Sequence, residues 1–123
     1  MDRDPLTERI IGCAIEVHRA LGPGLLESAY ERCLAYELGQ HGVQFRQQVT
    51  VPVDYKGIRI ECGYRIDLLV DDAVILELKS VDQLAPVHEA QVLTYMKLAR
   101  IRTGLLINFN KQRLIDGLRR FKL

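Results

Sequence analysis

Residues 64–80 read YRIDLLVDDAVILELKS, two apolar runs that each carry ionisable side chains. The apolar runs are typical of neighbouring β-strands, whereas Asp67, Glu77 and Lys79 are charged. A charge on a buried strand is costly unless it is paired or binds a metal. Side chains two residues apart in a strand share a face and lie about 7 Å apart, so Glu77 and Lys79 point the same way. The stretch therefore predicts a functional site within a buried sheet.

The connection between the two runs decides whether the two acids meet. A two-residue turn at residues 71–72 would put Asp67 on the opposite face of the sheet from Glu77. A three-residue loop at residues 71–73, or one bulge, brings Asp67 opposite Glu77. We therefore predict an odd-length connection. The alternative is a surface salt bridge between Glu77 and Lys79 on an edge strand, with Asp67 capping a turn.

The residue types at this site favour metal-dependent chemistry. Two carboxylates with nearby carbonyls and waters suit a hard divalent cation, Mg²⁺ or Mn²⁺. Zinc is disfavoured because no Cys/His cluster has ligand spacing. A lysine beside the metal would orient an attacking water or neutralise charge on a phosphate. The combination is typical of phosphodiester hydrolysis, and a metal-dependent phosphatase for small substrates is the weaker alternative.

The spacing D-x9-E-x-K resembles the catalytic core of the PD-(D/E)XK nuclease superfamily. A second motif, G-x-x-E-x-x-Y, places Gly24, Glu27 and Tyr30 in GPGLLESAYE and is similar to that of the bacterial GxxExxY proteins. The resemblance covers nearly the whole chain, through the segments EVHRALGPGLLESAYE, YRIDLL, ILELKS, HEAQVLTYMKL and GLLINF.

This resemblance implies roles for particular residues. In the superfamily an aspartate and a glutamate hold the metal, a lysine assists the water, and a glutamate on an early helix completes or supports the metal shell. By position, these roles fall on Asp67, Glu77, Lys79 and Glu27. The resemblance also implies a restriction-endonuclease-like core and a nucleic acid substrate.

Gln91 and Tyr95 form a Q-x-x-x-Y motif on the helix expected after the E-x-K strand. Residues four apart lie one above the other on a helix, so both side chains point at one spot. RecB-type nucleases of the same superfamily use a similar motif beside the metal, which implies that Gln91 places Lys79, a water or the substrate backbone. The alternatives are a core aromatic for Tyr95 and a solvated helix residue for Gln91.

His88 and Tyr30 are further candidates for contact with the substrate. His88 precedes Gln91 by nearly one turn and could touch phosphate or metal, or make a structural hydrogen bond at the helix N-terminus. Tyr30 follows Glu27 on the same helix face and could bond to the site carboxylates, or fill the gap between helix and sheet.

Length and composition limit the number of domains, the charge available for binding and the cellular compartment. The chain has 123 residues, 48% of them hydrophobic, and a formal charge of +1, which predicts a single domain, residues 1–123, without a basic field for autonomous nucleic-acid binding. Basic side chains that could touch phosphate gather late, at Lys111, Arg113, Arg119, Arg120 and Lys122. Three cysteines without CxxC spacing, no signal peptide and no apolar run near the length of a membrane span predict a reduced, cytoplasmic protein.

Hydrophobic periodicity predicts the elements. Helices are expected over residues 6–20, 25–40 and 87–100. Strands are expected over residues 49–55, 58–70, 73–79 and 103–109, and residues 117–123 form a final strand or an extended tail. Helices flanking a mixed sheet of about five strands give an α/β fold. A right-handed crossover sets residues 103–109 parallel to the E-x-K strand, at the centre of the sheet.

These features lead to two functional hypotheses of different classes. The first is a Mg²⁺-dependent nuclease that hydrolyses phosphodiester bonds, with DNA as the expected substrate. The second is a catalytically silent nuclease-fold module that binds nucleic acid or a protein partner, which the small size and neutral charge also fit. A homodimer is compatible with both.

Overall fold

The computed structural model describes residues 4–123. The domain predicted from the sequence also includes residues 1–3, which lie outside the described residues. The helices are α1 (Pro5–Leu21), α2 (Glu27–Gln40), α3 (Pro86–Ala99) and the 3-10 helix η1 (Leu114–Gly117). The strands are β1 (Phe45–Thr50), β2 (Val53–Tyr55), β3 (Ile58–Ile60), β4 (Arg65–Val70), β5 (Val74–Lys79), β6 (Thr103–Asn108) and β7 (Leu118–Lys122).

The first helix begins and ends at residues suited to those places. The Asp4 carboxylate accepts hydrogen bonds from the Leu6 N–H and the Thr7 hydroxyl, each at 3.1 Å, and Pro5 occupies the first turn, where its missing N–H costs nothing. Gly22 follows the last residue at φ 71°, a conformation that glycine adopts without steric cost.

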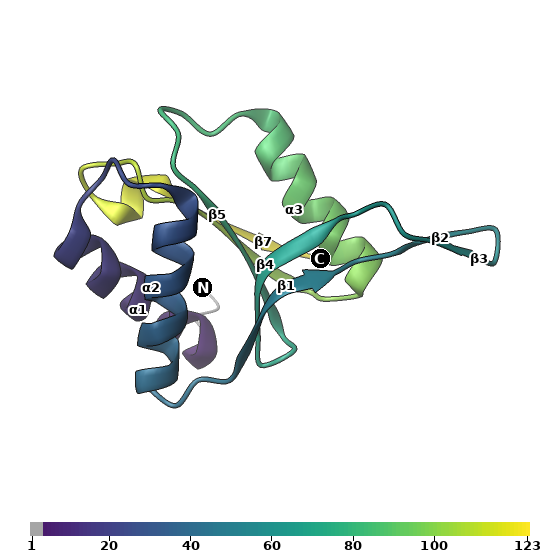
Figure 1. The fold of residues 1–123 in the computed structure, drawn as a ribbon, viewed down its shortest axis with the longest axis horizontal. Coiled ribbons are helices and arrows are strands. Elements are labelled where there is room, and N and C mark those ends of the chain that lie inside the picture. The colour runs from purple at the N-terminus through teal and green to yellow at the C-terminus, as the bar shows by residue number, and fades with distance from the viewer. Residues whose placement is uncertain (1–3) are drawn as a thin grey trace.

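Five strands form one mixed sheet in the order β1-β4-β5-β6-β7 (Figure 1). Only β5 and β6 are parallel, and α3 makes the crossover between them. The other neighbouring pairs are antiparallel. The predicted α/β fold with a mixed five-stranded sheet is confirmed, and it is consistent with a restriction-endonuclease-like core.

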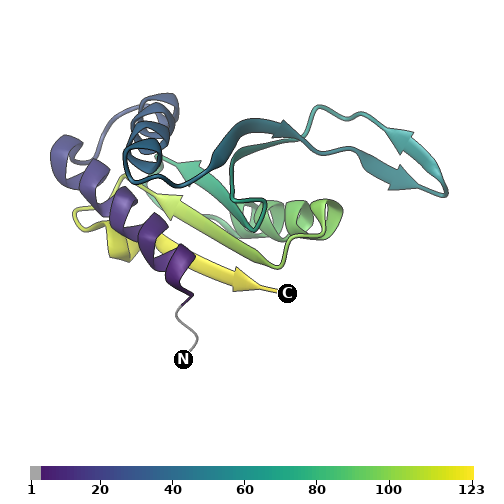
Figure 2. The same cartoon turned by 90° about the horizontal axis from the view of Figure 1, so that it is seen from below.

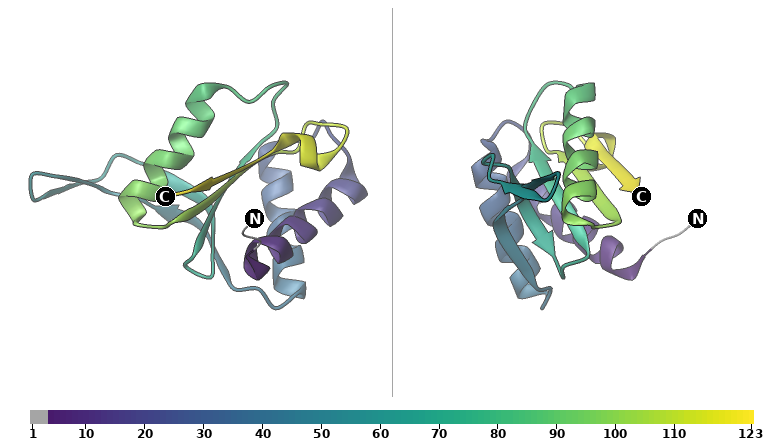
Figure 3. Two further views of the ribbon diagram at one scale, coloured as in Figure 1. Left: turned by 180° about the vertical axis from the view of Figure 1, so that it is seen from behind. Right: turned by 90° about the vertical axis from the view of Figure 1, so that its right-hand side faces the viewer.

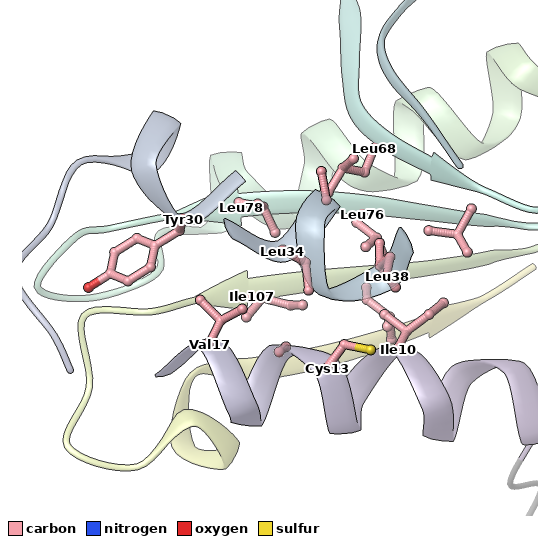
Figure 4. Close-up of a cluster of buried hydrophobic side chains, with 14 of the residues drawn as sticks. Ile10, Cys13, Val17, Tyr30, Leu34, Leu38, Leu68, Leu76, Leu78 and Ile107 are labelled. Carbon is pink, nitrogen blue, oxygen red and sulfur yellow. The ribbon is translucent and has the colours of Figure 1, made fainter. Parts of the chain in front are cut away.

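Helices cover both faces of this sheet (Figure 2). On one face, α1 and α2 bury a large apolar cluster, in which Ile10 and Leu34 lie over Leu76 and Ile107 (Figure 4). On the other face, α3 packs a smaller cluster against β4, β5 and β6. No helix within residues 4–123 has both the length and the apolar character needed to cross a membrane.

Two predicted strands were wrong in extent. Residues 49–55 divide between β1 and β2, and residues 58–70 divide between β3 and β4, so that β2 and β3 form a separate hairpin. This hairpin projects from the body of the protein (Figures 1 and 3). Pro52 has no N–H with which to continue the ladder, and Gly63 turns the returning chain at φ 78°.

The predicted centre of the sheet was off by one strand. β5 is the middle strand, and β6 lies between β5 and the edge strand β7. Every residue of β6 is nevertheless buried, because β7 covers its outer edge and helices cover both faces. An apolar run shows that a strand is interior, but it does not show its place in the order.

Substitution of Gly117 by alanine should destabilise the protein strongly. A Cβ at this position would lie 2.2 Å from the carbonyl oxygen of Asn108, and backbone atoms have little freedom to move away. We expect the free energy of unfolding to fall by about 2–3 kcal/mol or more, measured by urea denaturation. Gly12→Ala is the control, because a Cβ there meets nothing within 4 Å and alanine is the better helix former by about 1 kcal/mol. Equal stability of the two variants would contradict the steric reason.

Candidate functional site

A gap between β4 and β5 brings Asp67 and Glu77 together. The connection at residues 71–73 is a three-residue loop, with Val70 paired to Val74. The predicted odd-length connection is therefore confirmed. The paired register ends at Leu68 and Leu76, and one position further along the strands Asp67 lies opposite Glu77.

Each carboxylate accepts a hydrogen bond from the backbone of the other strand. The Asp67 N–H donates to Oε1 of Glu77 at 3.2 Å, and the Leu78 N–H donates to Oδ2 of Asp67 at 2.9 Å. These two bonds take the place of the backbone–backbone hydrogen bonds between β4 and β5, whose paired register ends at Leu68 and Leu76. They fix two acidic side chains beside each other, Glu77 buried at 3% exposure and Asp67 half-buried.

The environment of these acids opposes their ionisation. Burial is the main cause that raises the pKa of Glu77 to about 9, and the negative charge of Asp67 adds to it. Burial also raises the pKa of Asp67, against the hydrogen bond from Leu78, which acts in the opposite direction. Two desolvated oxygen-donor groups that repel one another are suited to a divalent cation, which would relieve the repulsion. The donor chemistry therefore fits Mg²⁺ or Mn²⁺.

Lys79 shares a face of β5 with Glu77. Side chains alternate along a strand, so Ile75, Glu77 and Lys79 point to one side, and Ile75 belongs to the cluster packed against α3. The positive charge of Lys79 lowers the pKa of Glu77, although burial and Asp67 outweigh it. Lys79 is half-buried, and within residues 4–123 no hydrogen bond or salt bridge is formed by its ammonium group.

Gln48 and Glu31 also reach the acid pair, and sequence reasoning missed both. The Gln48 amide lies 2.9 and 3.1 Å from the two carboxylate oxygens of Glu31 and 3.4 Å from Oδ1 of Asp67. Glu31 adds to the rise in the pKa of Asp67. Glu31 follows Glu27 by four residues on the same helix face, which was a usable signal. Nothing in the sequence marks Gln48, whose φ is 51°.

Two substitutions at Gln48 should distinguish the effect of its backbone conformation on stability from the effect of its side-chain contacts. The left-handed φ suits glycine and is most strained for a β-branched residue. Gln48→Val should lower the free energy of unfolding by about 1–3 kcal/mol. Gln48→Gly should change it by less than about 1 kcal/mol, because the relaxed backbone offsets the lost hydrogen bonds. Thermal melting of both variants tests this, and similar losses would show that the amide contacts dominate.

Glu27, the acid expected from the early helix, is exposed as the first residue of α2. It forms no hydrogen bond or salt bridge with the acid pair in the part of the chain that the structure describes. Across residues 4–123, no group of three or more His, Cys, Asp or Glu side chains is arranged to hold a metal. The structure thus brings two acids together, and the role of Glu27 stays a prediction.

The Q-x-x-x-Y motif lies on α3, on the same side of the sheet. Gln91 donates a hydrogen bond to the Tyr95 hydroxyl at 3.1 Å. Burial raises the pKa of Tyr95, and the charges of Glu77 and Asp67 add to the rise, so the phenol lies within electrostatic reach of the acid pair. His88 uses Nδ1 to accept a hydrogen bond from the Ala85 N–H at 2.9 Å, which is the structural alternative left open for it.

Tyr30 lies away from the carboxylates. It is fully buried and stacks on Phe109 with ring centroids 4.4 Å apart. Its hydroxyl donates to the carbonyl of Gly22 and accepts from the N–H of Leu25, tying the turn between α1 and α2. The geometry gives Tyr30 the packing role that was the alternative to substrate contact.

Three of the late basic residues, Arg119, Arg120 and Lys122, lie on β7. β7 is the edge strand furthest in the order from β1. Arg120 approaches Glu8 of α1 at 3.6 Å, and the Lys111 ammonium donates to the carbonyl of Asp82 at 2.9 Å. These contacts hold two of the basic groups against the protein itself.

Comparison with known proteins gives one match. A family model described as the PD-(D/E)XK nuclease superfamily matches residues 4–121. No curated protein and no solved structure matches the chain. The match covers both strands of the acid pair and all three α-helices, and it confirms the superfamily resemblance, while the narrower GxxExxY assignment stays a prediction.

Proposed function

Because this chain belongs to the PD-(D/E)XK nuclease superfamily, we propose that it is a Mg²⁺- or Mn²⁺-dependent nuclease that hydrolyses phosphodiester bonds of DNA. The observation that carries the proposal is the meeting of the Asp67 and Glu77 carboxylates in the β4–β5 gap, with Lys79 on the same face of β5. A single pair of carboxylates without the lysine would fit many metal-binding proteins. The lysine beside them fits phosphate chemistry.

The proposed roles follow from the position of each group. Asp67 and Glu77 would hold the cation, which when bound neutralises phosphate charge and lowers the pKa of a water. Lys79, free of other partners in the described structure, would orient the attacking water or stabilise charge on the phosphate. Gln91 would position the substrate backbone or a water, and Tyr95 and His88 would contact the substrate.

The direct test is cleavage of supercoiled, linear and single-stranded DNA with Mg²⁺ or Mn²⁺. Lys79→Ala should slow cleavage by about 100-fold or more and leave the melting temperature nearly unchanged, because the Lys79 ammonium forms no hydrogen bond or salt bridge within residues 4–123. Titration of Mn²⁺ by calorimetry should show binding to the wild type and none to Asp67→Ala. Equal cleavage by the wild type and Lys79→Ala would reject the proposed mechanism.

Two residues of α2, Glu27 and Glu31, are candidates for the acid that would support the metal site. The superfamily pattern assigns Glu27, whereas Glu31 is the helix acid whose charge acts on Asp67. Glu27→Gln and Glu31→Gln should be compared for Mn²⁺ affinity. We expect the supporting acid to be the one whose loss weakens binding by about 10-fold or more.

The absence of a three-acid group within residues 4–123 favours a second candidate function. This is a catalytically silent module that binds nucleic acid or a protein, as a homodimer or with another partner. Metal-independent DNA binding without cleavage of any substrate would support it, and loss of cleavage in Asp67→Ala would exclude it. Sedimentation analysis determines whether the protein pairs with itself.

A further inference from the structure

A mostly apolar hollow lies at the flank of α3, next to the Gln91–Tyr95 pair. It is a cavity of about 340 Å³ between Tyr64 and the α3 residues Val87, Gln91, Thr94 and Tyr95, and is called here the Tyr64 pocket. Tyr64 belongs to the chain between β3 and β4, which passes beside α3 (Figures 1 and 3). The ring centroids of Tyr64 and Tyr95 are 6.0 Å apart and the rings are tilted by 54°.

The Tyr64 pocket shares two residues, Gln91 and Tyr95, with the proposed catalytic site. Gln91 and Tyr95 line the pocket and also form the hydrogen-bonded pair on the side of α3 that faces the acids. Tyr64 directly precedes β4, the strand that carries Asp67. A polymer bound at the acid pair would therefore have its neighbouring units within reach of the pocket.

The lining selects a flat, weakly polar group. Within the described residues, the side chains around the pocket include no Lys, Arg, Asp or Glu, so the pocket offers no full charge to a phosphate. Tyr64 is 43% exposed and Val87 is 67% exposed, so two large side chains at the pocket are open to solvent. His88 and Gln91 add hydrogen-bonding groups at the rim: His88 accepts a backbone N–H at Nδ1, so its neutral ring carries the proton on Nε2.

We propose that the Tyr64 pocket binds an unpaired nucleobase, so that the substrate is single-stranded DNA or a single-stranded end. This inference rests on the proposed nuclease function. A base within a duplex is stacked and paired, and only an unpaired base presents its face to an aromatic side chain. Tyr64 supplies that face, and the phosphates remain free to lie along the acid pair.

Binding without cleavage tests the pocket separately from catalysis. Fluorescence anisotropy in EDTA compares a labelled single strand, the same strand with abasic sites, and a hairpin duplex. The wild type should bind the normal strand most tightly. Tyr64→Ala should weaken that binding by about 10-fold and leave the abasic strand unaffected. Tyr64→Phe keeps the ring and should bind like the wild type.

The matched control is Tyr36→Ala, which removes a 65% exposed tyrosine from α2. It should leave binding unchanged. Equal affinity of the wild type for normal and abasic strands, or equal effects of Tyr64→Ala and Tyr36→Ala, overturns the proposal. Binding that depends on the bases, without cleavage in Mg²⁺, would support the base-binding role of the Tyr64 pocket and reject the proposed nuclease function. Unaltered cleavage and binding by Tyr64→Ala would support the nuclease function and reject the base-binding role of the pocket.

Discussion

Glu77→Gln should abolish cleavage and at the same time make the metal-free protein more stable. Glu77 is 3% exposed and lies against another carboxylate, so its ionised form is disfavoured in the fold. Glutamine keeps the shape and the oxygen that accepts from the Asp67 N–H, and it removes the charge. We expect cleavage to fall by about 100-fold or more and the free energy of unfolding to rise by about 1–4 kcal/mol at pH 8.

Both effects are measurable on one preparation. Plasmid cleavage in Mg²⁺ gives the activity, and urea denaturation in EDTA gives the stability. Glu61→Gln is the control, because the Glu61 side chain is 62% exposed on the projecting hairpin, where it pairs with Arg59, and its loss should alter neither quantity. A destabilised but active Glu77→Gln variant would mean that this acid serves the fold and not the reaction.

The metal-free protein should lose stability as the pH rises from about 4.5 to about 9. Glu77 has its pKa raised from 4.5 to about 9 in the fold, so across this window the folded state holds a proton that the unfolded state has released. The stabilisation is complete below the lower value and is lost as the pH passes the upper one. One such group contributes a slope of up to about 1.4 kcal/mol per pH unit. The raised pKa of Asp67 acts with the same sign.

Charged groups on several neighbouring elements act on the two acids. Asp67 of β4 and Lys79 of β5 act on Glu77 in opposite directions, Glu31 of α2 acts on Asp67, and Tyr95 of α3 is affected by both acids. Cys13 and Tyr95 also have raised pKa values, but from ordinary values of 9.0 and 10.0. They affect stability only above pH 9, outside the window.

Urea denaturation at pH 5, 7 and 8.5 in EDTA measures the slope. Added Mg²⁺ should stabilise the protein more at pH 8.5 than at pH 5, because the cation competes with protons for the same oxygens. Glu77→Gln should flatten the metal-free curve. A wild-type curve that is already flat would show that Glu77 is ionised in the fold, and the expected stabilisation by glutamine would then fail as well.

Much of the architecture was readable from local patterns. Helical periodicity located the three α-helices to within about two residues, and the strand alternation around Asp67 and Glu77 required the odd-length loop that the structure has. The separation of the β2–β3 hairpin from the main sheet was not predicted, because apolar alternation continues through Pro52 and Gly63. The effect of these two residues on strand pairing depends on the neighbouring strands.

The sequence by itself determined the α/β fold class, the superfamily and the two acids with the lysine on one face, because strand alternation and side-chain charge are local properties of the chain. Only the tertiary structure decided which other groups join them. Gln48, which has a left-handed φ, reaches Asp67. The charge of Glu31, and not that of Glu27, acts on Asp67. The ring of Tyr64 lies beside that of Tyr95 on α3. The Gln48–Glu31, Gln48–Asp67 and Tyr64–Tyr95 contacts join residues 17 to 31 positions apart in the chain. Packing, which no local pattern encodes, sets which distant segments touch.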